Sequence, residues 1–204
     1  MNKMSEMTGR KHGLFDYYGA EDAKYVMVAM GSVTEAAEEL IDVLNARGGK
    51  YGIVKVHLYR PFSKKHFLDA MPSTVERVVV LDRTKEPGAN GEPLYLDVRD
   101  IFYGEENAPM VIGGRYGLGS KDTIPTDLNA AFENLTSDAP KGRFTLSITD
   151  DVTDHSIAAK EEIKIAHPGT VRCKFWGLGS DGTVGANKQA IKIIGDNTDK
   201  YVQA

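Results

Sequence analysis

The sequence Lys-Tyr-Val-Met-Val-Ala-Met at residues 24–30 decides the fold of this chain. The apolar run that follows Lys24, bounded by a glycine, is typical of a strand buried on both faces of a parallel sheet. Ser32 follows, three residues before Glu35, which is the spacing of a helix capping box. Apolar residues then recur at helical spacing up to the Gly-Gly pair at 48–49: Val33, Ala36, Ala37, Leu40, Ile41 and Leu44. With a second strand predicted over residues 51–59, the stretch predicts a βαβ unit, whose crossover is right-handed.

The same alternation of strands and helices continues along the chain. Further strands are predicted over 77–81, 110–113 and 143–148, and further helices over 66–71, 94–103 and 125–135. Five strands with helices between them can bury a substantial core. The sequence therefore predicts an α/β domain over residues 14–149, with three layers and a mostly parallel sheet.

The pattern stops at residues 150–169, which are acidic at first and then of mixed charge, and which we interpret as a linker. After it the sequence predicts a strand over 170–176, a glycine-rich loop and a helix over 183–194. A strand and a helix cannot bury their apolar faces alone. Residues 170–204 are therefore interpreted as a truncated strand–loop–helix opening of a second α/β domain, whose remainder is missing.

Charge and cysteine content exclude several classes of protein. The chain has 204 residues, with 25 Lys and Arg against 29 Asp and Glu, so its formal net charge is −4. Without a basic excess it is not expected to bind nucleic acid. Its apolar runs are far shorter than the roughly 20 residues that span a membrane, so no membrane segment is predicted. A single cysteine allows no intrachain disulfide, no Cys-x-x-Cys zinc site and no iron–sulfur cluster, and no two histidines have helical metal-pair spacing. We therefore predict no metal site and a cytoplasmic location.

A Gly-x-Gly-x-x-Gly motif at residues 177–182 lies between the predicted strand and helix near the carboxyl end. Glycines let a backbone approach an anion closely, and a helix amino terminus presents free N–H groups to it. The motif therefore suggests a phosphate or nucleotide site, and the alternative is a tight turn without a ligand. A dinucleotide site lacks its second half, because neither Asp196 nor Asp199 ends a visible second strand. The candidate phosphate contacts are Gly177, Gly179, Gly182, Thr183, Asn187 and Lys188.

Other motifs favour structural roles. Arg83 and Lys85 follow a buried strand and could contact an anion or a subunit, although a solvated loop is the simpler interpretation. The glycine-rich stretch at 113–119 is interpreted mainly as a turn. His57 and Cys173 lie in predicted strands, where a packed core histidine and a packed thiol are expected.

Six stretches of the sequence together resemble one family. They are residues 8–11 (Thr-Gly-Arg-Lys), 14–20, 58–62 (Leu-Tyr-Arg-Pro-Phe), 81–88 (Leu-Asp-Arg-Thr-Lys-Glu-Pro-Gly), 114–121 and 175–188. In this order and with these separations the chain resembles pyruvate:ferredoxin (flavodoxin) oxidoreductases. The resemblance covers essentially the whole chain.

The resemblance implies a long multidomain parent enzyme. Enzymes of this family convert pyruvate and CoA to acetyl-CoA and CO2 with thiamine diphosphate and Mg²⁺, and pass electrons through 4Fe-4S clusters to ferredoxin or flavodoxin. The chain resembles the second domain of the family, which is similar to the carboxyl-terminal domain of transketolase, over 14–149, and the start of the third domain over 170–204. Residues 1–13 would then be the connection from the preceding domain, and the parent is expected to be a homodimer.

For this chain the resemblance implies a supporting role. The thiamine and cluster sites of the family lie in other domains, so we expect no catalytic residue or bound cofactor here, and no activity from the isolated chain. The complete domain would be a scaffold for the remaining domains. Because the third domain of the family helps to bind coenzyme A, the loop at 177–188 is a candidate CoA phosphate contact. Two alternatives stay open: a free-standing subunit of a split 2-oxoacid oxidoreductase, and a small nucleotide-binding protein using that loop.

Overall fold

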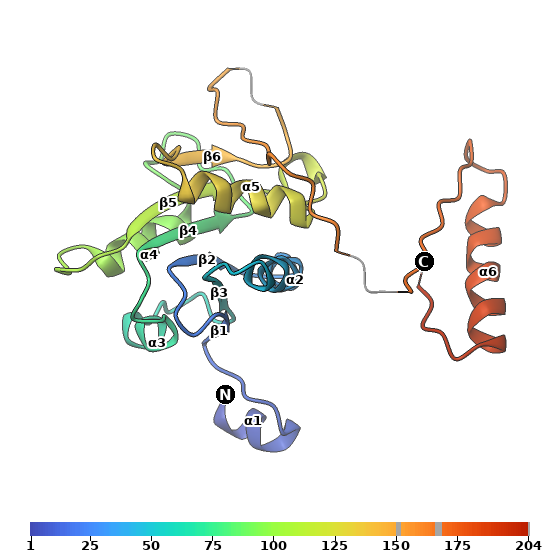
Figure 1. The fold of residues 1–204 in the computed structure, drawn as a ribbon, viewed down its shortest axis with the longest axis horizontal. Coiled ribbons are helices and arrows are strands. Elements are labelled where there is room, and N and C mark those ends of the chain that lie inside the picture. The colour runs from blue at the N-terminus through green and yellow to red at the C-terminus, as the bar shows by residue number, and fades with distance from the viewer. Residues whose placement is uncertain (150–151, 166–168, 204) are drawn as a thin grey trace. The chain divides into compact units, whose positions relative to one another are not determined.

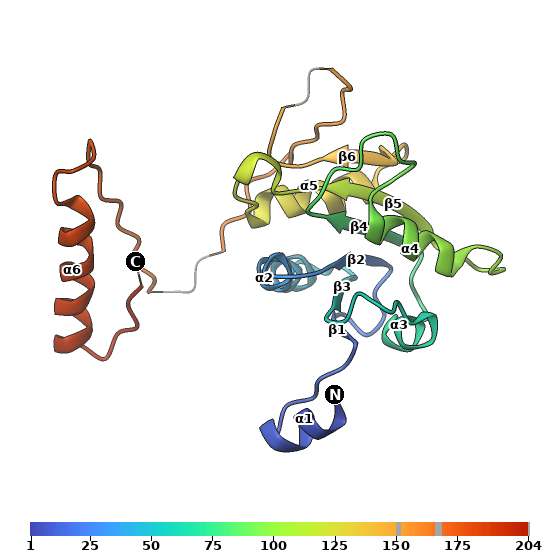
Figure 2. The same ribbon diagram turned by 180° about the vertical axis from the view of Figure 1, so that it is seen from behind.

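The chain forms two compact units, residues 1–165 and 166–204. The structure is a computed structural model that describes residues 1–149, 152–165 and 169–203. Figure 1 shows the elements of each unit, and Figure 2 shows them from behind. Each unit has its own secondary structure, and the sheet belongs to the first.

The sheet of the first unit has six strands in the order β1-β3-β2-β4-β5-β6. They are β1 (Phe15–Gly19), β2 (Tyr25–Ala29), β3 (Tyr51–Val56), β4 (Arg77–Asp82), β5 (Met110–Arg115) and β6 (Arg143–Thr145). Strands β2 to β6 run parallel, whereas β1 pairs antiparallel with β3 at one edge. The prediction of a mostly parallel sheet is therefore confirmed.

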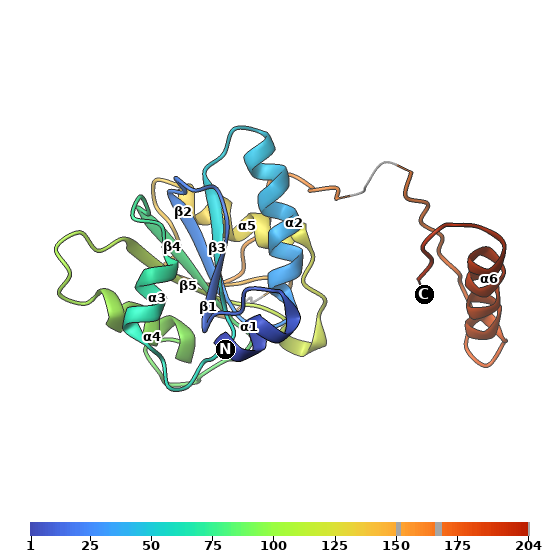
Figure 3. The same ribbon diagram turned by 90° about the horizontal axis from the view of Figure 1, so that it is seen from below.

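Helices cover both faces of this sheet, so the predicted three layers are confirmed. One face carries α2 (Val33–Ala46) and α5 (Pro125–Thr136), and the other carries α3 (Lys64–Ala70) and α4 (Pro93–Phe102), as Figure 3 shows. Because side chains alternate along a strand, Met27 of β2 packs toward α2 and α5 while Val26 and Val28 pack toward α3 and α4. Both faces of β2 and β4 are thus buried, which explains their unbroken apolar runs.

Two elements near the amino terminus were not predicted. Helix α1 (Asn2–Thr8) precedes the sheet, and β1 forms its antiparallel edge. In β1 only Phe15 is buried, and the residues after it are half-buried or exposed. Such an edge strand has no long apolar run, because one of its sides faces solvent. A short 3-10 turn, η1 (Leu118–Ser120), follows β5.

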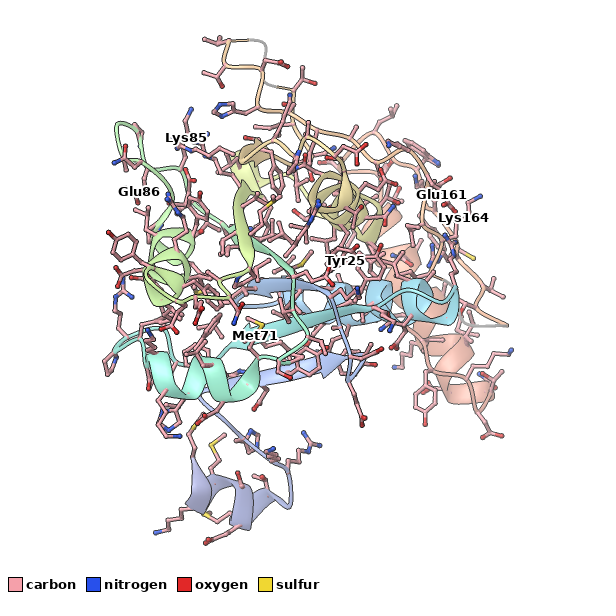
Figure 4. The ribbon with its side chains drawn as sticks, turned by 60° about the vertical axis from the view of Figure 1, so that its left-hand side comes forward. Tyr25, Met71, Lys85, Glu86, Glu161 and Lys164 are labelled. Atoms are coloured by element: carbon pink, nitrogen blue, oxygen red, sulfur yellow. The ribbon has the colours of Figure 1, made fainter. Side chains whose placement is uncertain are left out.

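The predicted linker is only partly correct. Residues 155–165 belong to the first unit: Ser156 forms an isolated β-bridge with Thr145 of β6, and Ile163 is buried in the core. Glu161 also forms an ion pair of 3.1 Å with Arg47 at the end of α2, and Figure 4 labels it. The sequence does not reveal this packing, because Ile163 stands among charged residues and a single buried side chain gives no periodic pattern. Residues 150–151 and 166–168 of the predicted linker lie outside the described residues.

The second unit contains one helix, α6 (Thr183–Asn197), within its described residues, where the sequence predicts a helix. The strand predicted over 170–176 is absent there, and those residues are exposed and non-helical. A strand needs a neighbouring strand for its N–H and C=O groups, and this segment has none. Together with α6 and residues 198–203 it lines a groove of about 740 Å³, whose apolar side chains include Val171, Phe175, Ile191, Ile194, Tyr201 and Val202.

Candidate functional site

The strand order reverses between β2 and β4. From β2 the chain passes through α2 to β3 on one side, and β4 then lies on the other side of β2. In open α/β sheets ligands bind in the crevice outside the carboxyl ends of the strands at such a switch point. The residues that follow these two strands, at 30–32 and 83–84, are therefore the candidate site that the topology selects.

Two cavities lie at this edge, with volumes of about 330 and 360 Å³. They share Ser32, Arg83 and Tyr116 in their linings, and we call them together the switch-point crevice. The first is also lined by Val33, Ala36, Gly117 and residues 120–124, and the second by Met30, Gly31, Tyr59, Leu81, Asp82, Thr84 and Pro93. The crevice thus collects the segments that follow four of the parallel strands, β2 to β5.

Arg83 lines both cavities, and the residue is exposed to solvent. Its side chain packs over Gly117, where a Cβ atom would stand 2.9 Å from the Arg83 Nε atom and φ is +63°. Within the described part of the chain the Arg83 guanidinium forms neither a hydrogen bond nor an ion pair. Beside it, the Tyr116 hydroxyl donates to the Met30 carbonyl at 3.3 Å; burial raises the pKa of Tyr116, and the charge of Arg83 opposes that rise. Lys85 does not join the crevice and is exposed on the following loop with Glu86 (Figure 4).

Two buried acidic side chains beside the crevice, Asp82 and Glu92, stabilise the fold. The Asp82 carboxylate accepts hydrogen bonds from the backbone N–H groups of Leu94 (2.9 Å) and Tyr95 (3.1 Å), so it holds the amino terminus of α4. Burial raises the pKa of Asp82 to about 6 although those two hydrogen bonds oppose the rise. Glu92 accepts a hydrogen bond of 2.6 Å from the Arg115 Nε atom, and both side chains are buried. These charges fix α4 against β4 and β5.

The remaining motifs of the first unit have structural roles. A Cβ atom at Gly113 would stand 2.7 Å from the ring of Tyr95, and one at Gly114 would stand 2.3 Å from the ring of Phe144. The stretch at 113–119 therefore lets aromatic side chains pack on the backbone of β5. Arg60, in the motif at 58–62, pairs with Asp97 at 2.6 Å.

In the second unit, the carboxylate of Asp181 accepts hydrogen bonds at both ends of the glycine loop, from Leu178 and Thr183. Asp181 accepts hydrogen bonds from the backbone N–H of Leu178 (2.8 Å), from the backbone N–H of Thr183 (3.1 Å) and from the Thr183 hydroxyl (2.6 Å). The hydrogen bonds from Thr183 lower the pKa of Asp181. A Cβ atom at Gly177 would stand 2.3 Å from the Thr183 Oγ1 atom, so a glycine is required there. The carboxylate thus occupies the place at the start of α6 where an anion would bind.

The side chains predicted to bind a phosphate at this loop, Thr183, Asn187 and Lys188, do not all lie on one side of it. Thr183 lies in the loop network, and Asn187, four residues later, lies on the same side of α6 and lines the groove. Lys188 is exposed and does not line the groove. Sequence reasoning overlooked Asp181, although an acid two residues before a helix is a common amino-terminal signal.

Two predicted core residues are exposed instead. The His57 ring lies at the end of β3 and its Nε2 atom is 3.1 Å from Asp16 Oδ2. Cys173 is exposed in the segment where no strand forms. Sequence reasoning also missed Ser32, Asp82 and Tyr116 as residues of one crevice, because only the strand order brings them together.

Among the described residues, no group of three or more His, Cys, Asp or Glu side chains could hold a metal ion. In the same residues no helix has the length and apolar character needed to cross a membrane.

Comparison with protein families gives a match over residues 23–128, just over half of the chain, to pyruvate:ferredoxin oxidoreductase core domain II. Several curated relatives match the whole chain. Three of them are the pyruvate-flavodoxin oxidoreductase of Klebsiella pneumoniae (55% identical over 205 residues), the pyruvate:ferredoxin oxidoreductase of Moorella thermoacetica (54% over 203) and the probable pyruvate-flavodoxin oxidoreductase of Escherichia coli K12 (49% over 209).

The chain spans less than a fifth of each of these relatives, 18, 17 and 18% respectively. Among solved structures, a 2-oxoglutarate:ferredoxin oxidoreductase from Magnetococcus marinus matches with a TM-score of 0.40 and 18% identity. That match covers 60% of this chain and 19% of the other.

Proposed function

The chain belongs to the family of pyruvate:ferredoxin oxidoreductase core domain II, and we propose that it acts as part of a larger pyruvate oxidoreductase. That enzyme would convert pyruvate and CoA to acetyl-CoA and CO2 and pass the electrons to ferredoxin or flavodoxin. The observation that carries this proposal is the whole-chain match, at 55% identity, to 18% of a pyruvate-flavodoxin oxidoreductase. Both units of the chain take part in that match.

Within such an enzyme the first unit would be a scaffold. Residues 14–149 would be the second domain, residues 170–204 the start of the third, and residues 1–13 the connection before them. The buried charges support this role, because the Asp82 and Glu92 carboxylates hold α4 in place. The single cysteine cannot supply the several thiolates of a 4Fe-4S cluster, so the clusters would be held by other domains. Thiamine diphosphate and Mg²⁺ would likewise belong to other domains, in a homodimeric parent.

The glycine loop would contribute to CoA binding. An anion at the start of α6 needs the N–H groups of Leu178 and Thr183, and both are bonded to Asp181. A CoA phosphate therefore fits this loop only when the Asp181 carboxylate turns away. Asn187 and Lys188 would then supply donors from the first turns of the helix. The role is thus phosphate contact, with no part in the chemistry.

The native size of the protein tests the first proposal. An antibody raised against this chain should detect one polypeptide several times larger than 22.3 kDa in the source cells. That polypeptide should reduce ferredoxin or flavodoxin in the presence of pyruvate and CoA, and the isolated chain should not. A band at 22.3 kDa would contradict the proposal and identify a free-standing subunit.

Steady-state kinetics of the larger enzyme test the loop. Lys188→Gln should raise the KM for CoA several-fold with little change in kcat, because a phosphate contact binds ground state and transition state equally. Lys192→Gln, one turn further along α6 and also exposed, removes the same charge and should leave the KM unchanged. Equal KM values in all three proteins would remove the loop from CoA binding.

A further inference from the structure

We propose that the switch-point crevice of the first unit binds a nucleoside phosphate. The inference concerns a different unit from the glycine loop and does not rest on the proposed enzyme. It starts from the place of the crevice, between the carboxyl ends of β2 and β4, where open α/β sheets bind their ligands.

The charge of the first cavity suits an anion. Arg83 and Lys121 both line it, and in the part of the chain that the structure describes neither side chain has a hydrogen bond or an ion pair. Asp122 is the acid in the same lining, so two positive charges stand against one negative charge. The Asp82 carboxylate, in the second cavity, is already engaged by the N–H groups of Leu94 and Tyr95. Both residues are exposed, and an arginine guanidinium and a lysine ammonium are each common phosphate ligands.

One polar atom of this cavity has no partner. The Thr123 Oγ1 atom is buried and forms no hydrogen bond, although Thr123 lines the first cavity. A buried hydroxyl without a partner costs free energy, and a phosphate oxygen would supply the missing acceptor once the Thr123 side chain turns toward the cavity. Ser32 adds a second hydroxyl to the lining at the start of α2.

The second cavity suits a flat, apolar group attached to that phosphate. Its lining includes the rings of Tyr59, Tyr116 and Pro93, together with Met30 and Leu81. Nucleic-acid bases stack on aromatic rings, and pockets of about 300 Å³ or more hold small ligands. Because both cavities share Arg83 and Tyr116, one molecule can place its phosphate in the first and its base in the second.

Titration of the 204-residue chain with AMP and with inorganic phosphate, followed by calorimetry, tests the proposal. AMP should bind saturably and more tightly than phosphate. Arg83→Gln should weaken AMP binding by about tenfold or more, the effect expected for loss of a charge-assisted hydrogen bond. Arg10→Gln makes the same charge change at an exposed residue outside the crevice and should leave AMP binding unchanged.

Lys121→Gln is the second variant, because Arg83 also packs on Gly117 and its loss could disturb the loop. Lys121 is exposed, and its replacement should weaken AMP binding several-fold without changing the circular dichroism spectrum. Absence of saturable AMP binding, equal affinity for AMP and phosphate, or equal weakening by Arg10→Gln would overturn the proposal.

Discussion

The helices α2 and α6 have nearly the same length, 14 and 15 residues, but different surroundings. Helix α2 buries Val33, Ala37, Leu40 and Ile41 against the sheet and α5. Helix α6 buries none of its described residues, and Ile193 and Ile194 remain exposed. Both sequences have helical periodicity, so the difference lies in what is available to cover the apolar side.

A helical sequence pattern alone does not make a helix stable. Isolated helices of this length are marginal in water, and most helical stability in proteins comes from packing an apolar face. The first unit supplies that packing through a sheet covered on both faces, whereas the described residues of the second unit, 169–203, form one helix flanked by two exposed segments. We therefore expect the two units to differ sharply in stability.

Hydrogen exchange should show the largest difference. Amides of β2 and β4 should exchange only by global unfolding, which costs about 5–15 kcal/mol in ordinary domains, whereas α6 should open at almost no cost. Protection should thus differ by about a thousandfold or more, as measured by mass spectrometry of the intact chain. Similar protection in residues 24–148 and 170–204 would show that the second unit is stable on its own.

Glu92→Gln should be the most damaging single substitution. It removes the negative partner of the buried Arg115 and leaves an uncompensated charge, at a cost of about 3–5 kcal/mol. Glu105→Gln breaks the half-exposed ion pair with Lys64 and should cost less than about 1 kcal/mol. Urea unfolding followed by circular dichroism measures both, and equal effects would show that the buried pair is not needed.

Replacing one isoleucine in each unit compares how much a buried and an exposed apolar side chain contribute to stability. Ile53→Ala empties a fully buried position in β3 and should cost about 2–5 kcal/mol. Ile193→Ala, at a position 57% exposed in α6, should change stability by less than about 0.5 kcal/mol. The same urea experiment applies, and a large effect at Ile193 would reveal a core in the second unit.

Ionisation of Asp82 should make the unfolding free energy of the first unit depend on pH, and this effect should be smaller than those above. Its pKa is raised from an ordinary 3.8 to about 6 in the folded state, so the folded state binds its proton more tightly than the unfolded state does. The resulting stabilisation is fully present below about pH 4 and is lost as the pH rises through about 6, by about 1–3 kcal/mol. Comparing unfolding free energies of the wild type and Asp82→Asn from pH 4 to pH 8 measures this loss. A constant difference between them would contradict the raised pKa.

Local sequence predicted the interior of the fold well. Strands β2 and β4 are apolar on both faces, and α2 and α5 show helical spacing, so their burial is readable without the structure. Strand β1 was missed because its pairing with β3 depends on a distant segment and buries only Phe15. The strand predicted over 170–176 failed for the converse reason, since an apolar pattern forms no strand without a partner.

The candidate site was predictable only in pieces. Arg83 could be singled out because it follows a buried strand, but its neighbours Ser32 and Tyr116 come from the ends of other strands. Their meeting depends on the reversal of strand order between β2 and β4, which no local pattern encodes. In the glycine loop the sequence indicated an anion site, and the structure adds that Asp181 already fills it.

The exposed position of the second unit's aromatic residues gives the chain a built-in optical reporter. Trp176 is the single tryptophan of the sequence, and it is 84% exposed, with the Lys174 ammonium 5.2 Å from its ring centroid. Indole fluorescence therefore comes entirely from the unit that lacks a core. Its emission should shift to shorter wavelengths when this surface is covered by another protein domain, and it should stay unchanged while the sheet of the first unit unfolds.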